Sequence, residues 1–459
     1  MSVRLFFFSV LLPSVLWPAV VWADDAINSA EPALKIGSTF EGSSVKPQAT
    51  NTLDRTPALR GAIIDTLSNS NSLKSAAVQA KAAQYDSQAA LRDLLPSINL
   101  SLEKGYRKGL SSGFPVLSNV DTASLNATWT VFAGGSKIAN AIAADLNAKS
   151  SRLNYLVQER NEALKVASAY LQILADRKFV VVLLESRSHL LRIRRNSQLE
   201  FNAGLASQTD VLLVTSQISD VDLQIIDANK DLQTQTLALS ALTGKAAPDI
   251  THLPAIENLI PNDLPATLRR AMNGNLTVAV TEYAAQSLSA QADASRGKLS
   301  PIVSIIGQAQ TDLDNLVDSS KPAVNQNWYI GVKLDVPLTN FAAYSQLDAA
   351  RARASAARYH MLDSKTQIEK EVATNWHELM SMRQKSVVFD QKIAANRIVT
   401  SGVAKEVKAG LRSVSDLLRA ESNLASTEFE QIRNEVNRAA LAYRIAVHFT
   451  DLPTEMLGG

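Results

Sequence analysis

Apolar residues recur every three or four positions along much of this chain, a spacing typical of helices that pack along a coiled-coil seam. The first seam has one polar position, Gln235, and the second contains several small residues. The first consists of Val211, Val214, Ile218, Val221, Ile225, Ala228, Leu232, Gln235, Leu239 and Leu242. The second consists of Leu418, Ser422, Ala425, Phe429, Ile432, Val436, Ala439, Tyr443 and Ala446.

The placement of proline indicates how long these helices are. Proline is absent from 116–247 and from 338–452, and because proline breaks helix interiors, long helices can run there. The segment Ser136–Phe201 predicts one helix, which would be about 100 Å long at 1.5 Å per residue. That length favours a coiled coil or a helical tube over an ordinary helical hairpin.

A second pattern, strict alternation of apolar and polar residues, predicts two pairs of strands. The four segments are Ser97–Glu103, Ser124–Phe132, Ser300–Gln310 and Asn327–Leu338. The polar linkers GLSSGFPVLSNVD and DNLVDSSKPAVNQN are predicted to be loops. Strands of about 8–12 residues suit an outer-membrane barrel, although a small soluble antiparallel sheet would alternate in the same way.

The order of these elements occurs twice, which indicates an internal duplication. Each half reads helix, strand, polar loop, strand, very long helix, Ala-Gly-Leu corner and helix. The predicted halves are 52–244 and 266–459, and a linker with several prolines, 245–265, separates them. The corners read FNAGLASQTDVLL in the first half and VKAGLRSVSDLL in the second.

Local chemistry explains each corner. Gly204 and Gly410 are expected to adopt the left-handed conformation that ends a helix. Ser207 with Asp210, and Ser413 with Asp416, have the S-x-x-D spacing of a capping box, which begins the next helix. Helix capping alone could therefore account for both acids.

Composition excludes several classes of function. The net charge of +2 gives no reason to expect nucleic acid as a partner. Without cysteine there is no disulfide, thiolate nucleophile or zinc–cysteine site. His377-Glu378 begins like a zinc HExxH helix, but Ser381 replaces the second histidine. Thr243-Gly244-Lys245 resembles only the end of a phosphate-binding loop. We expect no enzymatic activity and no cofactor.

The N-terminus, 1–23, has the plan of a cleaved signal peptide, in which one arginine precedes an apolar run and Val21-Trp22-Ala23 follows it. A single membrane anchor is the alternative. Residues 24–51 lack periodicity and are predicted to be a flexible extension. Beyond them no apolar segment is long enough for a membrane-spanning helix, so an integral membrane protein would have to use its strands.

The LLPS turn into a strand, the VFAGG strand exit and the paired Ala-Gly-Leu corners resemble the TolC family of outer-membrane channel proteins. The resemblance covers the chain from about Thr52 to the C-terminus. It implies a mainly helical fold, in which a homotrimer builds a periplasmic α-helical barrel and a twelve-stranded outer-membrane β-barrel. Four strands per chain cannot close a barrel alone, because the smallest bacterial barrels have about eight.

The resemblance also assigns roles to the corners. Asp210, Arg412, Asp416 and Arg419 would form the periplasmic aperture, and a periplasmic adaptor protein would dock on the helical tips at Gly204, Leu205, Gly410 and Leu411. Two positions depart from the family pattern. Val407 stands where the best-described gate has tyrosine, and Arg419 stands where it has aspartate.

The function expected from this resemblance is an outer-membrane exit duct. It would carry the protein substrate of a type I secretion system from an inner-membrane ABC transporter and its adaptor to the exterior. The absence of a lipidation cysteine favours this reading over the alternative, multidrug or small-molecule efflux with another transporter. A soluble periplasmic coiled-coil scaffold is a third possibility.

Overall fold

The computed structural model describes residues 57–111, 114–312 and 327–451. The predicted signal peptide and N-terminal extension lie outside these residues, and so does most of the predicted loop DNLVDSSKPAVNQN. The helices are α2 (Pro57–Asn69), α3 (Asn71–Arg92), α4 (Ser136–Asn202), α5 (Gln208–Thr243), η1 (Ile256–Leu259, a 3-10 turn), α6 (Leu264–Met272), α7 (Leu276–Gly297), α9 (Phe341–Lys408) and α10 (Val414–Ala446). The strands are β1 (Ser97–Ser111), β2 (Phe114–Ala133), β3 (Ile302–Asp312) and β4 (Asn327–Asp335).

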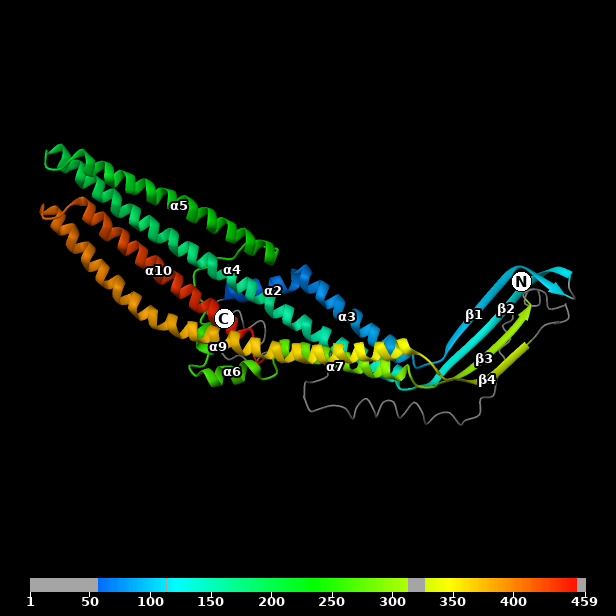
Figure 1. Cartoon of the computed structure of the whole chain (residues 1–459). Coiled ribbons are helices and arrows are strands. Elements are labelled where there is room, and N and C mark those ends of the chain that lie inside the picture. Colours follow the sequence, from blue (N-terminus) through cyan, green and yellow to red (C-terminus); the bar gives the residue numbers. More distant parts are fainter. Residues whose placement is uncertain (1–56, 112–113, 313–326, 452–459) are drawn as a thin grey trace. The chain divides into compact units, whose positions relative to one another are not determined.

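Two very long helices dominate the fold. Helix α4 has 67 residues and α9 has 68, so each is about 100 Å long at 1.5 Å per residue. The predicted long helix is confirmed to within one residue. Helix α4 packs along α5, α9 packs along α10, and α10 also lies against α4 (Figure 1).

The predicted seams are the faces along which these helices pack. All ten positions of the first seam are buried or half-buried, and in the second only Ser422 is exposed. Val214, Ile218 and Val221 of α5 share one apolar cluster with Leu183 and Leu190 of α4. The heptad pattern therefore predicted the packing because burial of apolar area drives it.

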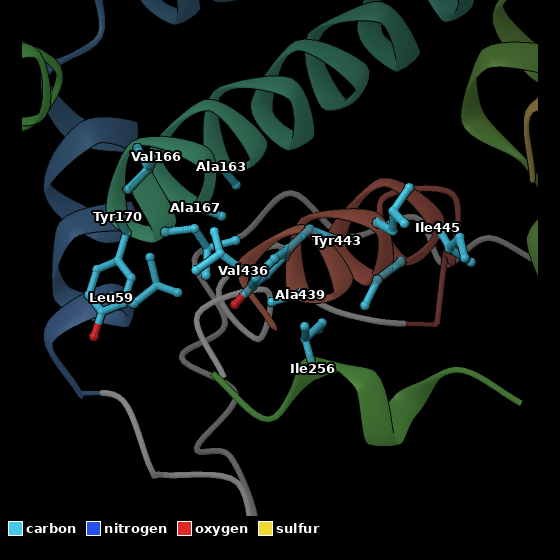
Figure 2. Close-up of a cluster of buried hydrophobic side chains, with 14 of the residues drawn as sticks. Leu59, Ala163, Val166, Ala167, Tyr170, Ile256, Val436, Ala439, Tyr443 and Ile445 are labelled. Carbon is cyan, nitrogen blue, oxygen red and sulfur yellow. The ribbon is translucent and has the colours of Figure 1, made fainter. Parts of the chain in front are cut away.

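A larger core joins the two halves of the chain (Figure 2). It brings Leu59 of α2 and Tyr170 of α4 together with Ile256 of η1 and Tyr443 of α10. The Tyr170 hydroxyl donates to the backbone carbonyl of His252 at 3.0 Å. Segments far apart in the sequence thus meet in one hydrophobic core.

The four strands form one antiparallel sheet in the order β1-β2-β3-β4. The prediction that GLSSGFPVLSNVD is a loop is mostly wrong, because β1 and β2 remain paired as far as Ser111 and Phe114. A backbone ladder can continue without alternating side chains. Among the described residues β2 pairs with β3 only from Thr122 onward, so no described strand needs an N–H from Pro115 on that side of β2.

The second pair of strands lies close to its prediction. Strand β3 begins two residues later than expected, and β4 ends at Asp335 rather than Leu338. Pro337 follows two residues later, and it has no N–H to donate to a ladder. Within the three described ranges, no helix combines the length and apolar character needed to cross a membrane.

Candidate functional site

The two faces of the sheet differ sharply in polarity. The register places the odd and even positions of each strand on opposite faces. The polar face carries Asn99, Ser101 and Glu103 of β1 and Ser124, Asn126 and Thr128 of β2. The apolar face carries Ile98, Leu100, Leu102, Ala123, Leu125, Ala127, Trp129, Val303, Ile305, Gly307, Ala309, Trp328, Ile330, Val332 and Leu334.

Much of this apolar face is not covered by the rest of the described chain. Ile98 is 67% exposed and Trp328 is 78% exposed. A contiguous apolar surface of this kind marks contact with a membrane or another protein. Strands that are apolar on one face and polar on the other are typical of outer-membrane barrels, where lipid lies outside and water inside.

The sheet also has two open edges. Within the described residues β1 pairs only with β2, and β4 pairs only with β3. The outer edge of each therefore presents unpaired N–H and C=O groups, which are ready to accept a further strand. In lipid such groups have to be paired, because no water is present to bind them.

The two corners have the same backbone geometry. Gly204 and Gly410 are left-handed, with φ values of 75° and 72°, as predicted. The N–H of Leu205 donates to the carbonyl of Glu200 at 2.8 Å, and the N–H of Leu411 donates to that of Glu406 at 2.9 Å. With the bonds from the glycine N–H groups, these contacts complete a Schellman motif at the end of α4 and of α9.

A capping box begins each returning helix, as predicted. The Ser207 hydroxyl donates to Asp210 Oδ2 at 2.9 Å, and the Ser413 hydroxyl donates to Asp416 Oδ2 at 2.8 Å. In each box the backbone N–H of the acid donates in turn to the serine oxygen. The hydrogen bonds from Ser413 lower the pKa of Asp416, and the charges of Arg419 and Arg412 add to this effect.

Within the part of the chain that the structure describes, the arginine of the second corner pairs with a residue that the sequence did not single out. Arg412 Nε lies 2.7 Å from Glu406 Oε2, and no ion pair joins Arg412 to Asp210 or Asp416. The pairing of Arg412 with corner acids across an aperture concerns contacts between chains, so it stays a prediction. One signal for Glu406 was available, because Glu200 occupies the same place in the first corner.

The tips of both corners are exposed to solvent in the described chain. Leu205 is 82% exposed and Leu411 is 77% exposed, although the residue at this place in a Schellman motif usually packs against the preceding helix. A Cβ atom added at Gly204 or Gly410 would meet nothing within 4 Å. The predicted docking residues therefore lie at accessible positions.

A groove of about 780 Å³ lies beside the corners, between α4 and the α9–α10 hairpin. Its apolar lining includes Ile193, Leu199 and Val407. On its wall His189 Nδ1 lies 3.2 Å from Glu421 Oε2, a contact that joins α4 to α10. Sequence reasoning missed this pair, because no local spacing connects two residues so far apart in the chain.

A sheet with one apolar exposed face, joined to paired helices of about 100 Å, is typical of an envelope channel subunit. The chain belongs to the outer membrane efflux protein family, whose model matches residues 62–245 and 267–445. This confirms the predicted family and the predicted location in the outer membrane. Proteins of this family are channels and not enzymes.

Two relatives illustrate the similarity. The outer membrane efflux protein BepC of Brucella suis biovar 1 (strain 1330) is 20% identical over 338 residues, which is 73% of this chain and 74% of BepC. The outer membrane protein TolC of Salmonella enteritidis is 26% identical over 245 residues, which is 53% of this chain and 48% of that TolC. The alignment therefore spans only about half of that relative.

A solved structure of CusC, whose study concerns folding and transmembrane channel formation, has the same fold. Its TM-score is 0.78 at 16% identity, over 91% of this chain and 97% of CusC. At this identity the likeness concerns the fold alone. It confirms the predicted fold class of long antiparallel helices combined with a four-stranded antiparallel sheet.

Proposed function

We propose that this protein is a homotrimeric exit duct through the outer membrane, in which three chains of four strands each close a twelve-stranded barrel. The observation that carries the proposal is the sheet, which has one apolar exposed face and two open edges. Pairing β4 of one chain with β1 of the next would satisfy both edges. The apolar face would then meet lipid and the polar face would line water.

The helices support the same assembly. Helix α5 exposes Leu212, Leu223 and Ile226, and α9 exposes Val388 and Ile398. These apolar side chains lie on the outer helices of the paired hairpins, where a neighbouring chain would cover them. In a trimer the helices would form a tunnel through the periplasm.

The first test is the mass of the detergent-extracted mature protein, with planar-bilayer conductance measured on the same sample. We expect a trimer with discrete, long-lived channels. A soluble monomer or dimer without conductance would show that the sheet is an ordinary one and would favour the periplasmic scaffold.

The second part of the proposal is an aperture formed by Asp210, Arg412, Asp416 and Arg419, repeated in three chains. An exposed ion pair contributes only about 0–1 kcal/mol, so threefold repetition could close an entrance that a partner can still open. Asp416→Ala should raise single-channel conductance or admit vancomycin to cells. Ser413→Ala is the matched control, because it weakens the capping box but keeps the carboxylate. Unchanged conductance and unchanged resistance in Asp416→Ala would exclude the role in gating.

The third part is docking of a periplasmic adaptor on Gly204, Leu205, Gly410 and Leu411. The exposed tips and the groove beside them support this assignment. Replacing both leucines with aspartate should abolish co-purification of the adaptor while the trimer mass is unchanged. Retained adaptor binding would place the docking surface elsewhere.

Two kinds of cargo are proposed. Efflux of small molecules is supported by the family description and by the name of BepC. Type I protein secretion, through an ABC transporter and its adaptor, is favoured by the absence of cysteine from this 459-residue sequence. Deletion of the gene separates them. Loss of a secreted protein indicates the second cargo, and increased drug sensitivity without that loss indicates the first.

A further inference from the structure

The two corners share their acids and their backbone geometry. Glu200 and Glu406 stand at equivalent positions, and so do Asp210 and Asp416. Both glutamates supply the carbonyl that closes the Schellman motif, and both aspartates complete a capping box. The aspartate side chains therefore serve a structural purpose that is the same at both corners, whereas the glutamates contribute only a backbone carbonyl to it.

The bases of the second corner have no such purpose. Each stands where the first corner has an uncharged residue, and the first corner folds in the same way without it. All four are exposed in the structure. They are Lys405, Lys408, Arg412 and Arg419, at the positions equivalent to Leu199, Asn202, Ala206 and Leu213.

The charges at the second corner do not cancel. Within ten residues of Gly410 there are four basic and two acidic residues, a net of two positive charges per chain. Within ten residues of Gly204 two arginines balance two acids. The acids of the second corner are also half-buried, and their oxygens face Ser413 or Arg412, whereas Lys405, Lys408 and Arg419 are exposed.

We propose that the basic residues of the second corner make the entrance of the duct select anionic solutes. The inference rests on the proposed trimer, which would gather three copies of this corner around one mouth. Charges of one sign around an opening raise the local concentration of counter-ions. Screening acts over about 8 Å at physiological ionic strength, so the effect is strongest at low salt.

The test is the reversal potential of single channels between unequal KCl concentrations. The wild-type channel should pass chloride in preference to potassium. Arg419→Glu should shift the reversal potential toward the equilibrium potential of potassium. Arg419→Gln should give a smaller shift in the same direction. The matched control is Arg269→Glu, which makes the same charge change at an exposed position on α6.

Channels that prefer potassium, or an unchanged reversal potential in Arg419→Glu, would overturn this inference and leave the duct intact. An equal shift in Arg269→Glu would also overturn it, because the effect would then reflect total charge. A protein that forms no channel at all would overturn the proposed function and this inference with it.

Discussion

The junction between the strands and the long helices depends on two glycines, Gly134 and Gly297, whose backbones approach each other closely. Gly134 is the first of the two glycines in the VFAGG exit from β2 and has a φ of 59°. A Cβ added there would overlap the Cβ of Ser300 and lie 2.6 Å from the carbonyl oxygen of Gly297. A Cβ on Gly297 would in turn lie 2.8 Å from the carbonyl oxygen of Gly134. The two backbones are therefore too close for any side chain.

Gly134→Ala should destabilise the protein more than Gly135→Ala. Both positions have positive φ, 59° and 80°, so both substitutions cost about 1–2 kcal/mol of backbone strain. Gly135 has open space around it. At Gly134 the overlap with Ser300 and Gly297 adds about 1–3 kcal/mol of overpacking. We expect losses of about 2–5 kcal/mol for Gly134→Ala and about 1–2 kcal/mol for Gly135→Ala.

Thermal unfolding of the purified protein in detergent, followed by circular dichroism, measures the difference between the two variants. Gly297→Ala should lose only the overpacking part, about 1–3 kcal/mol, because it closes the same contact from the other side without a positive φ. Equal losses at Gly134 and Gly135 would refute the reasoning, since backbone strain alone would then explain both.

Two further predictions concern buried charges on α4. Arg160 is buried and donates through Nη1 to the carbonyls of Val447 at 3.0 Å and Phe449 at 2.6 Å. Arg160→Met should cost about 2–5 kcal/mol and speed amide hydrogen exchange just after α10. Asp176 is buried, and burial raises its pKa, so the folded protein should lose stability as pH rises through that pKa. Asp176→Asn keeps the acceptor for Gln172. The free energy of unfolding of this variant should be about 1–3 kcal/mol higher near neutral pH, and it should no longer depend on pH in this way. An unchanged melting temperature of Asp176→Asn near neutral pH would contradict the second prediction.

The sequence predicted those parts of the fold that burial of apolar residues determines. The seam from Val211 to Leu242 became the packed face of α5 because only one side of a helix can be turned away from water. The strands could be predicted from the alternation of apolar and polar residues, because only one face of each strand is apolar. The extension of β1 to Ser111 was not predictable in this way, because backbone hydrogen bonds hold that part of the hairpin and leave no periodic pattern of side chains.

The corners were predictable because their interactions are local. Gly204 and Ser207 act on residues within four positions of themselves, and short motifs encode such contacts directly. The contact of Arg412 with Glu406 is also local, but no short motif encodes it, whereas that of His189 with Glu421 depends on how α4 and α10 pack together. Contacts across an aperture depend further on neighbouring chains, which the folding of one chain cannot supply.

The two corners together separate the requirements of folding from those of function. What both corners share, a left-handed glycine followed by a serine and an aspartate, is what a helix needs to end and a second helix to begin. Arg412 and Arg419 occur at one corner only, and the other corner folds without them. A substitution at either arginine should therefore change the entrance with little effect on stability, whereas Ser413→Ala should weaken a helix start by about 1 kcal/mol. We therefore propose that the second corner acts on its cargo or its partners through the residues in which it differs from the first.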